Sequence, residues 1–84
     1  MIKFATFNCN SIRKNVESVK ELLRSNDIVF LQELMLLRED LGFLKELNKD
    51  FSCTACAKGV KDNEIATGRP SKGVAIFFRN TLLN

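Results

Sequence analysis

Two segments constrain the fold of this chain most, IVFLQ at residues 28–32 and GVAIFFR at residues 73–79, because nearly all of their positions are apolar. A β-strand that is apolar on both faces normally lies inside a sheet, with other layers packed above and below it. Any fold of the chain must therefore cover both faces of the sheet that these segments form.

The first 32 residues have the pattern of a strand, a helix and a second strand. Residues 2–8, IKFATFN, are rich in β-branched and aromatic residues and predict a strand. Residues 14–25 carry apolar side chains at helical spacing and predict an amphipathic helix that ends before the strand at 28–32. This order, within about 30 residues, is typical of a right-handed βαβ unit with parallel strands.

The remaining residues predict a second helix over 39–48, a strand over 51–57, a long loop over 58–72 and a strand over 73–79. We therefore expect an α/β fold in the order β-α-β-α-β-β, with a mixed sheet and both helices on one face. No segment of the 84 residues is left to cover the second face. A large exposed apolar face is an association site, so we expect either the N-terminal part of a larger domain or pairing with another chain.

Composition excludes several classes of function. The chain has no histidine, so it cannot alone supply an imidazole base or a histidine metal ligand. Its longest apolar run, Val74–Phe78, is five residues, whereas a membrane span needs about 20, so we expect no membrane partner. We see no signal peptide and only three cysteines, which predicts an intracellular protein with reduced thiols.

Two of these cysteines, Cys53 and Cys56, form a C-x-x-C pattern on a predicted strand. Residues i and i+3 of a strand point to opposite faces, so the pair cannot chelate one ion. We interpret both as small core residues. The net charge of +3 is a mild bias, which permits nucleic acid as a partner without requiring it.

Polar residues follow the two predicted parallel strands where each strand ends. Asn8 ends the first strand and Gln32-Glu33 ends the second, and ligands of open α/β sheets bind at this edge. An amide can orient a phosphate or a water, and a carboxylate is the hard oxygen ligand that Mg²⁺ prefers. The alternative is that Asn8 and Asn10 only form a turn and that Glu33 is a surface acid.

The same residues carry a resemblance. KFATFNCNSIRK…DIVFLQE resembles the opening of the exonuclease–endonuclease–phosphatase superfamily, in which a strand ends in S/T-x-N-x-N, a helix follows, and a second strand ends in Q-E. Asp50-Phe51 followed by GRPSKGVAI at residues 68–76 is similar to the GRP-x-GG-V-A-I stretch in endonuclease domains of non-LTR (LINE-type) retrotransposons. The resemblance runs from residue 2 to about residue 80.

This resemblance implies that residues 1–84 are the N-terminal part of a truncated DNase I-like α/β sandwich. It assigns Asn8 as the active-site Asn and Glu33 as the catalytic metal ligand, with Asn10 close to the metal and Gln32 as a supporting neighbour. The implied reaction is hydrolysis of a phosphodiester assisted by Mg²⁺ (or Mn²⁺). The family's Asp base and phosphate-holding His come from later segments, so the fragment alone is expected to be inactive.

The resemblance also implies DNA as a partner and nicking of target DNA in the nucleus for retrotransposition, with the missing C-terminal part of the domain completing the site. Arg69 and Lys72 are candidate contacts to DNA phosphates, although Lys72 can equally be an exposed lysine in a charged loop. Three residues depart from the family pattern, namely Ser11, Leu34 and Lys72, which replace Gly, Thr and Gly.

Two other interpretations remain open. The chain can be a degenerate, non-catalytic remnant that acts as a binding module through its uncovered sheet face. It can also be a fragment of another branch of the superfamily, such as a repair nuclease or a lipid or inositol phosphatase.

Overall fold

The computed structural model describes residues 1–56 and 73–83. In chain order, with η for a 3₁₀ helix, the elements are β1 (Phe4–Asn8), η1 (Ile12–Lys14), α1 (Val16–Ser25), β2 (Ile28–Gln32), η2 (Arg38–Glu46), β3 (Phe51–Cys56), β4 (Val74–Arg79) and η3 (Asn80–Leu83).

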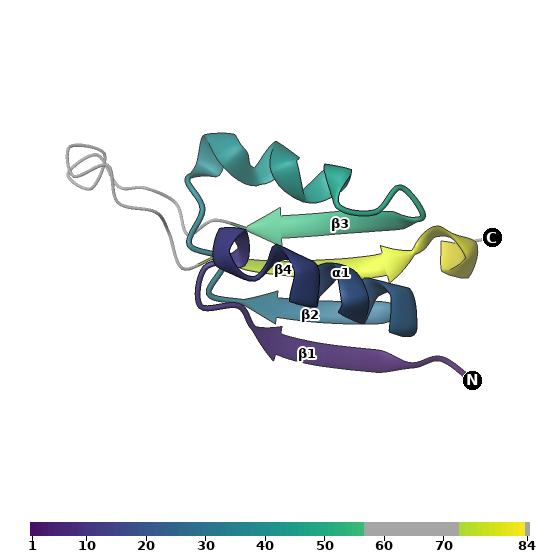
Figure 1. The fold of residues 1–84 in the computed structure, drawn as a ribbon. Coiled ribbons are helices and arrows are strands. Elements are labelled where there is room, and N and C mark those ends of the chain that lie inside the picture. The colour runs from purple at the N-terminus through teal and green to yellow at the C-terminus, as the bar shows by residue number, and fades with distance from the viewer. Residues whose placement is uncertain (57–72, 84) are drawn as a thin grey trace.

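The strands form one mixed sheet in the order β1-β2-β4-β3 (Figure 1). β1 and β2 are parallel, and α1 connects them, which confirms the expected βαβ unit. β4 is antiparallel to both of its neighbours. The predicted α/β class and mixed sheet are therefore confirmed, and the architecture is compatible with a truncated DNase I-like fold.

The helices differ from expectation in kind and in extent. The predicted helix over 14–25 is divided by Asn15, whose φ and ψ of −126° and 28° are not helical, into the short η1 and the longer α1. The predicted helix over 39–48 is a 3₁₀ helix over Arg38–Glu46 that contains Gly42, a residue that weakens the α conformation. No helix in the described part of the chain is long and apolar enough to cross a membrane. The predicted loop over 58–72 lies outside the described residues.

Both longer helices pack on the same face of the sheet, where α1 lies against β2 and η2 lies against β3 (Figure 1). The side chains between these layers form one core. Its buried apolar members are Cys9, Ile12, Val19, Leu23, Val29, Leu31, Leu34, Leu36, Leu44, Phe51, Ala75 and Phe77. The expectation that the helices cover one face is confirmed.

The opposite face of the sheet is uncovered by any described residue. Strand register arranges twelve outward side chains in three rows across the four strands: Phe4, Ile28, Phe78 and Ser52; Thr6, Phe30, Ile76 and Thr54; Asn8, Gln32, Val74 and Cys56. None of the twelve is charged. Apolar side chains on this open face remain exposed, with 67% for Phe4, 39% for Phe30, 51% for Val74 and 40% for Ile76.

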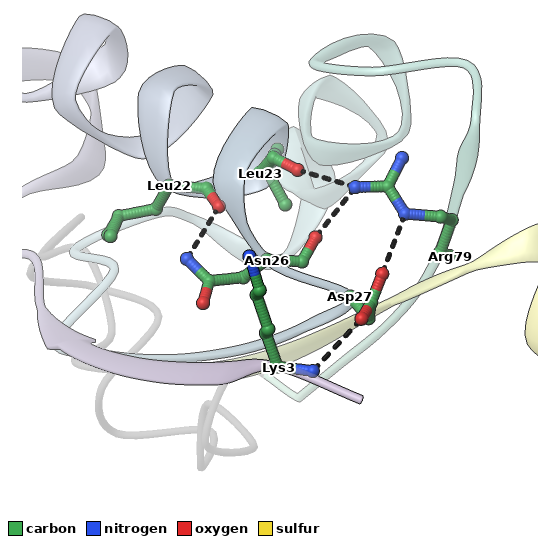
Figure 2. A network of polar contacts seen from close by, with 6 residues as sticks. All are labelled: Lys3, Leu22, Leu23, Asn26, Asp27 and Arg79. Atoms are coloured by element: carbon green, nitrogen blue, oxygen red, sulfur yellow. Dashed lines mark hydrogen bonds and ion pairs between the residues drawn. The ribbon is translucent and has the colours of Figure 1, made fainter. Parts of the chain in front are cut away.

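A polar network ties the strands together at the end of the sheet where β1 and β2 begin (Figure 2). The Asp27 carboxylate accepts the backbone N–H of Lys3 at 2.9 Å and the Arg79 Nε–H at 3.1 Å. Arg79 also donates to the carbonyl oxygens of Leu23 and Asn26, at 3.2 and 2.8 Å, and so binds the C-terminal end of α1 to β4. A cation there also interacts favourably with the helix dipole.

This network predicts a stability that depends on acidity. The Lys3 N–H first, and then Arg79, lower the pKa of Asp27 below its ordinary 3.8. A lowered folded-state pKa stabilises the fold above the unfolded value, and this contribution is lost as the pH falls through the folded value. We expect Asp27→Asn to melt at a lower temperature than the wild type at pH 6, and the difference to shrink as the pH falls below 3.8.

Thermal melts followed by circular dichroism at several pH values measure this difference. Asp40→Asn is the matched control, because Asp40 lies 3.8 Å from Arg13 in an exposed pair that contributes little. A difference between wild type and Asp27→Asn that stays the same from pH 6 to pH 2 contradicts the role given to Asp27.

Candidate active site at the carboxyl ends of β1 and β2

The register of β1 and β2 places Asn8 beside Gln32, so the two strands end together. Glu33 follows Gln32 directly, and its carboxylate Oε2 accepts a short hydrogen bond from the Nδ2 of Asn8. Two residues 25 positions apart along the chain therefore meet at one edge of the sheet, as the pattern of strand endings predicts.

The Asn8 amide is held in one orientation. Its Oδ1 accepts the backbone N–H of Asn10 at 3.1 Å, which leaves Nδ2 to donate to Glu33. On the neighbouring strand, Gln32 Nε2 donates to Thr6 Oγ1 at 2.8 Å. Gln32 thus links β2 to β1 one row away from Asn8, which agrees with a supporting position.

Backbone hydrogen bonds continue past the ends of the two strands. The N–H groups of Cys9, Ser11 and Ile12 donate to the carbonyl oxygens of Gln32, Glu33 and Leu34, at 2.8, 3.1 and 3.1 Å respectively. Cys9, Ile12 and Leu34 are completely buried and fix both segments to the core. The polar residues between them are therefore presented on a rigid support.

Backbone strain is concentrated at this edge. Among the described residues, the non-glycine residues with positive φ are Asn10 at 44°, Ser11 at 83°, Glu33 at 52° and Met35 at 55°, and each comes within three residues after the end of β1 or β2. Asn tolerates this conformation, but for a Glu it costs about 1–2 kcal/mol. Such conformations cluster where strain serves a function, so the backbone indicates a functional site independently of the side chains.

The donor set at this edge suits a hard divalent cation with few protein ligands. Glu33 supplies one carboxylate, and none of the described residues donates a hydrogen bond to its second oxygen, Oε1. Within residues 1–56 and 73–83, no three Cys, Asp or Glu side chains gather in one place. Mg²⁺ is compatible with such a sparse site, because it retains several waters and takes one or two carboxylates. A Zn²⁺ site normally uses three or four Cys, His, Asp or Glu ligands, and the described residues bring no such group together.

Cys9 and Cys53 supply no reactive group to the site. Burial raises the pKa of the Cys9 thiol to about 11, so it is protonated at neutral pH and acts as an apolar anchor. Burial likewise raises the pKa of Cys53 to about 11. Cys53 is half-buried on the helix side, as expected, whereas Cys56 points to the open face and is exposed, so its interpretation as a core residue is wrong.

The structure brings together four of the six predicted site residues, namely Asn8, Asn10, Gln32 and Glu33. The other two, Arg69 and Lys72, lie outside the described residues. Sequence reasoning missed Thr6 and Asn15, which hold Gln32 and the backbone around Asn10. For Thr6 a signal existed, because alternation along β1 puts it on the same face as Asn8.

A comparison with known protein families matches nearly the whole chain. The family model described as the endonuclease/exonuclease/phosphatase family matches residues 5–84, which is nearly the whole chain and includes all four of the residues brought together at the sheet edge. No curated protein matches the chain.

Proposed function

We propose that this chain, which belongs to the endonuclease/exonuclease/phosphatase family, carries one half of the active site of a Mg²⁺-dependent DNA endonuclease. The family is one of nuclease- and phosphatase-type hydrolases, which supports a hydrolase function for the chain. The observation that carries the proposal is the hydrogen bond from Asn8 to Glu33 at the ends of two parallel strands.

In the proposed mechanism, the residues of this chain orient one another and supply a negative charge that binds the cation. Glu33 offers a carboxylate oxygen to a hard cation, and Asn8 holds that carboxylate while Asn10 fixes the Asn8 amide through its backbone N–H. A bound Mg²⁺ or Mn²⁺ supplies charge stabilisation at the scissile phosphate and at the leaving oxygen. The chain has no histidine, so we propose that the groups that activate the attacking water come from another part of the domain.

The uncovered face of the sheet supports a second element of the proposal. Twelve outward positions without a charge, several of them large and apolar, match the inner face of a two-sheet sandwich, in which sheets pack about 10 Å apart. We propose that the missing C-terminal part of the same domain covers this face. The alternative, a non-catalytic module that binds a separate partner there, rests on the same surface.

The retrotransposon branch, with target DNA as the partner and the nucleus as the location, rests on residues 68–76. The structure describes only the last four of these, Gly73–Ile76, where the chain enters β4. The sheet edge described above fits a repair nuclease or a lipid or inositol phosphatase of the same family equally well, and substrate profiling separates these branches.

A plasmid-nicking assay tests the proposed activity. We expect the 84-residue chain alone to leave supercoiled DNA intact in Mg²⁺, and a chain extended through the C-terminal part of the domain to nick it. Glu33→Ala in the extended chain should lower the rate by a factor on the order of a thousand, because the cation loses its carboxylate.

Two results contradict this proposal. One is reproducible nicking by the 84-residue chain that Glu33→Ala abolishes, which would make the fragment a complete enzyme. The other is an extended chain that folds, binds Mg²⁺ and cleaves neither DNA nor a phosphorylated lipid or inositol.

A further inference from the structure

Asn15 occupies the N-cap position of α1 but does not cap the helix. An N-cap side chain normally accepts a hydrogen bond from a backbone N–H in the first turn of the helix. Asn15 makes no such bond. Its Nδ2 instead donates to the carbonyl oxygens of Cys9, at 2.7 Å, and Ser11, at 3.4 Å. The N-terminus of α1 therefore lacks a cap from the Asn15 side chain, which binds the segment that follows β1 instead.

This segment carries the geometry of the site. The carbonyl groups that Asn15 binds lie on either side of Asn10, whose own N–H orients the Asn8 amide toward Glu33. Asn10 and Ser11 have positive φ values of 44° and 83°, so the turn is strained and needs contacts to hold it. The side-chain amide of Asn15 provides such contacts from a half-buried position at the start of a rigid helix.

We propose that Asn15 is a positioning residue of the cation site, which holds the turn at residues 9–11 closed so that Asn8 and Glu33 meet. This inference rests on the proposed function, because it gives Asn15 an effect on cation binding that acts through Asn8 and Glu33. A purely structural role would instead make Asn15 important for the stability of α1 and indifferent to the cation.

Asn15→Ser separates the two roles. Serine is as good an N-cap residue as asparagine and carries no charge, but it is too short to reach the Cys9 carbonyl group as the amide does. The readouts are Mn²⁺ affinity, from paramagnetic broadening of amide signals in the full 84-residue chain, and amide hydrogen exchange. We expect Mn²⁺ to bind about tenfold more weakly. We also expect faster exchange at Cys9, Ser11 and Ile12, with protection of the α1 amides unchanged.

Two further variants sharpen the result. Asn15→Asp keeps the shape of the side chain and is a good N-cap acceptor, and its negative charge by itself favours cation binding. If Asn15→Asp nevertheless binds Mn²⁺ more weakly than the wild type, the cause is the loss of the amide donor. Asn26→Ser is the matched control, because Asn26 Nδ2 donates to the Leu22 carbonyl oxygen at 3.0 Å at the other end of the same helix. Its Mn²⁺ affinity should stay within about twofold of the wild type.

The outcomes distinguish this inference from the function on which it rests. Mn²⁺ affinity in Asn15→Ser within twofold of a wild type that binds Mn²⁺ at Glu33 overturns the role of Asn15 alone. Loss of α1 protection in Asn15→Ser in step with the loss of Mn²⁺ binding also overturns it. A wild-type chain that binds no Mn²⁺ at this edge overturns the proposed function as well.

Discussion

We expect lysine at both Phe30 and Ile76 to be tolerated by the 84-residue chain and to unfold a chain that also contains the proposed C-terminal part of the domain. In the 84-residue chain both side chains lie on the open face, 39% and 40% exposed, so the double variant should fold within about 1 kcal/mol of the wild type and self-associate less. If a C-terminal part of the domain covers this face, as we propose, the same positions become core in a chain that contains it. Burying two unpaired charges costs several kcal/mol each, enough to unfold a domain with a stability of about 5–15 kcal/mol.

Sedimentation velocity and circular dichroism of the two chain lengths measure both effects. Glu46→Lys is the matched control, because it changes the net charge by the same amount at an exposed position of η2, away from the open face. It should leave both chain lengths folded. An extended chain that folds normally with lysines at Phe30 and Ile76 would show that the open face stays uncovered, and would favour the separate binding module.

Glu33→Gln is expected to abolish divalent-cation binding without unfolding the chain. Glutamine retains the size of the side chain and can still accept the hydrogen bond from Asn8, but it removes the carboxylate that a hard cation needs. We expect Mn²⁺ affinity to fall by at least about a hundredfold, which titration of the 84-residue chain measures. Glu17→Gln, at an exposed position in the first turn of α1, should change that affinity little.

Glu33→Gly tests the same position in a second way, because stability and cation binding are expected to change in opposite directions. The positive φ of 52° suits glycine and strains glutamate, so this variant should be more stable than the wild type by about 0.5–1 kcal/mol while losing the cation. A gain in stability with a loss of binding is the expected result if strain is retained for function. A Glu33→Gly variant that is less stable than the wild type would show that the Glu33 side chain serves the fold.

The sequence predicts those parts of the site that follow from the register of the strands. IVFLQ predicts β2 with the bounds observed, and a parallel βαβ unit then has to bring the ends of β1 and β2 together. The uncovered face was also predictable, because β2 and β4 are apolar on both faces and both helices are needed on one side.

Other features depend on contacts that a local pattern does not contain. The bond from Arg79 to Asp27 joins residues 52 positions apart and exists only because β4 pairs with β2 in this register. Asn15 lies inside the helix that the sequence predicts over 14–25, and its bond to the Cys9 carbonyl group follows from the turn between β1 and α1. The positive φ of Glu33 has no sequence signal, because glutamate is not a residue that this conformation selects.

Titration of the ¹⁵N-labelled wild-type chain with Mn²⁺ tests the cation site most directly. If Asn8 and Glu33 form that site, the amide signals of Asn8, Asn10 and Glu33 broaden first, while those of Asp27 and Arg79 at the far end of the sheet persist. Uniform broadening, or broadening that begins around Asp27, would show that the cation has no preference for this edge, and the assignment of Asn8 and Glu33 to a hydrolase active site would be wrong.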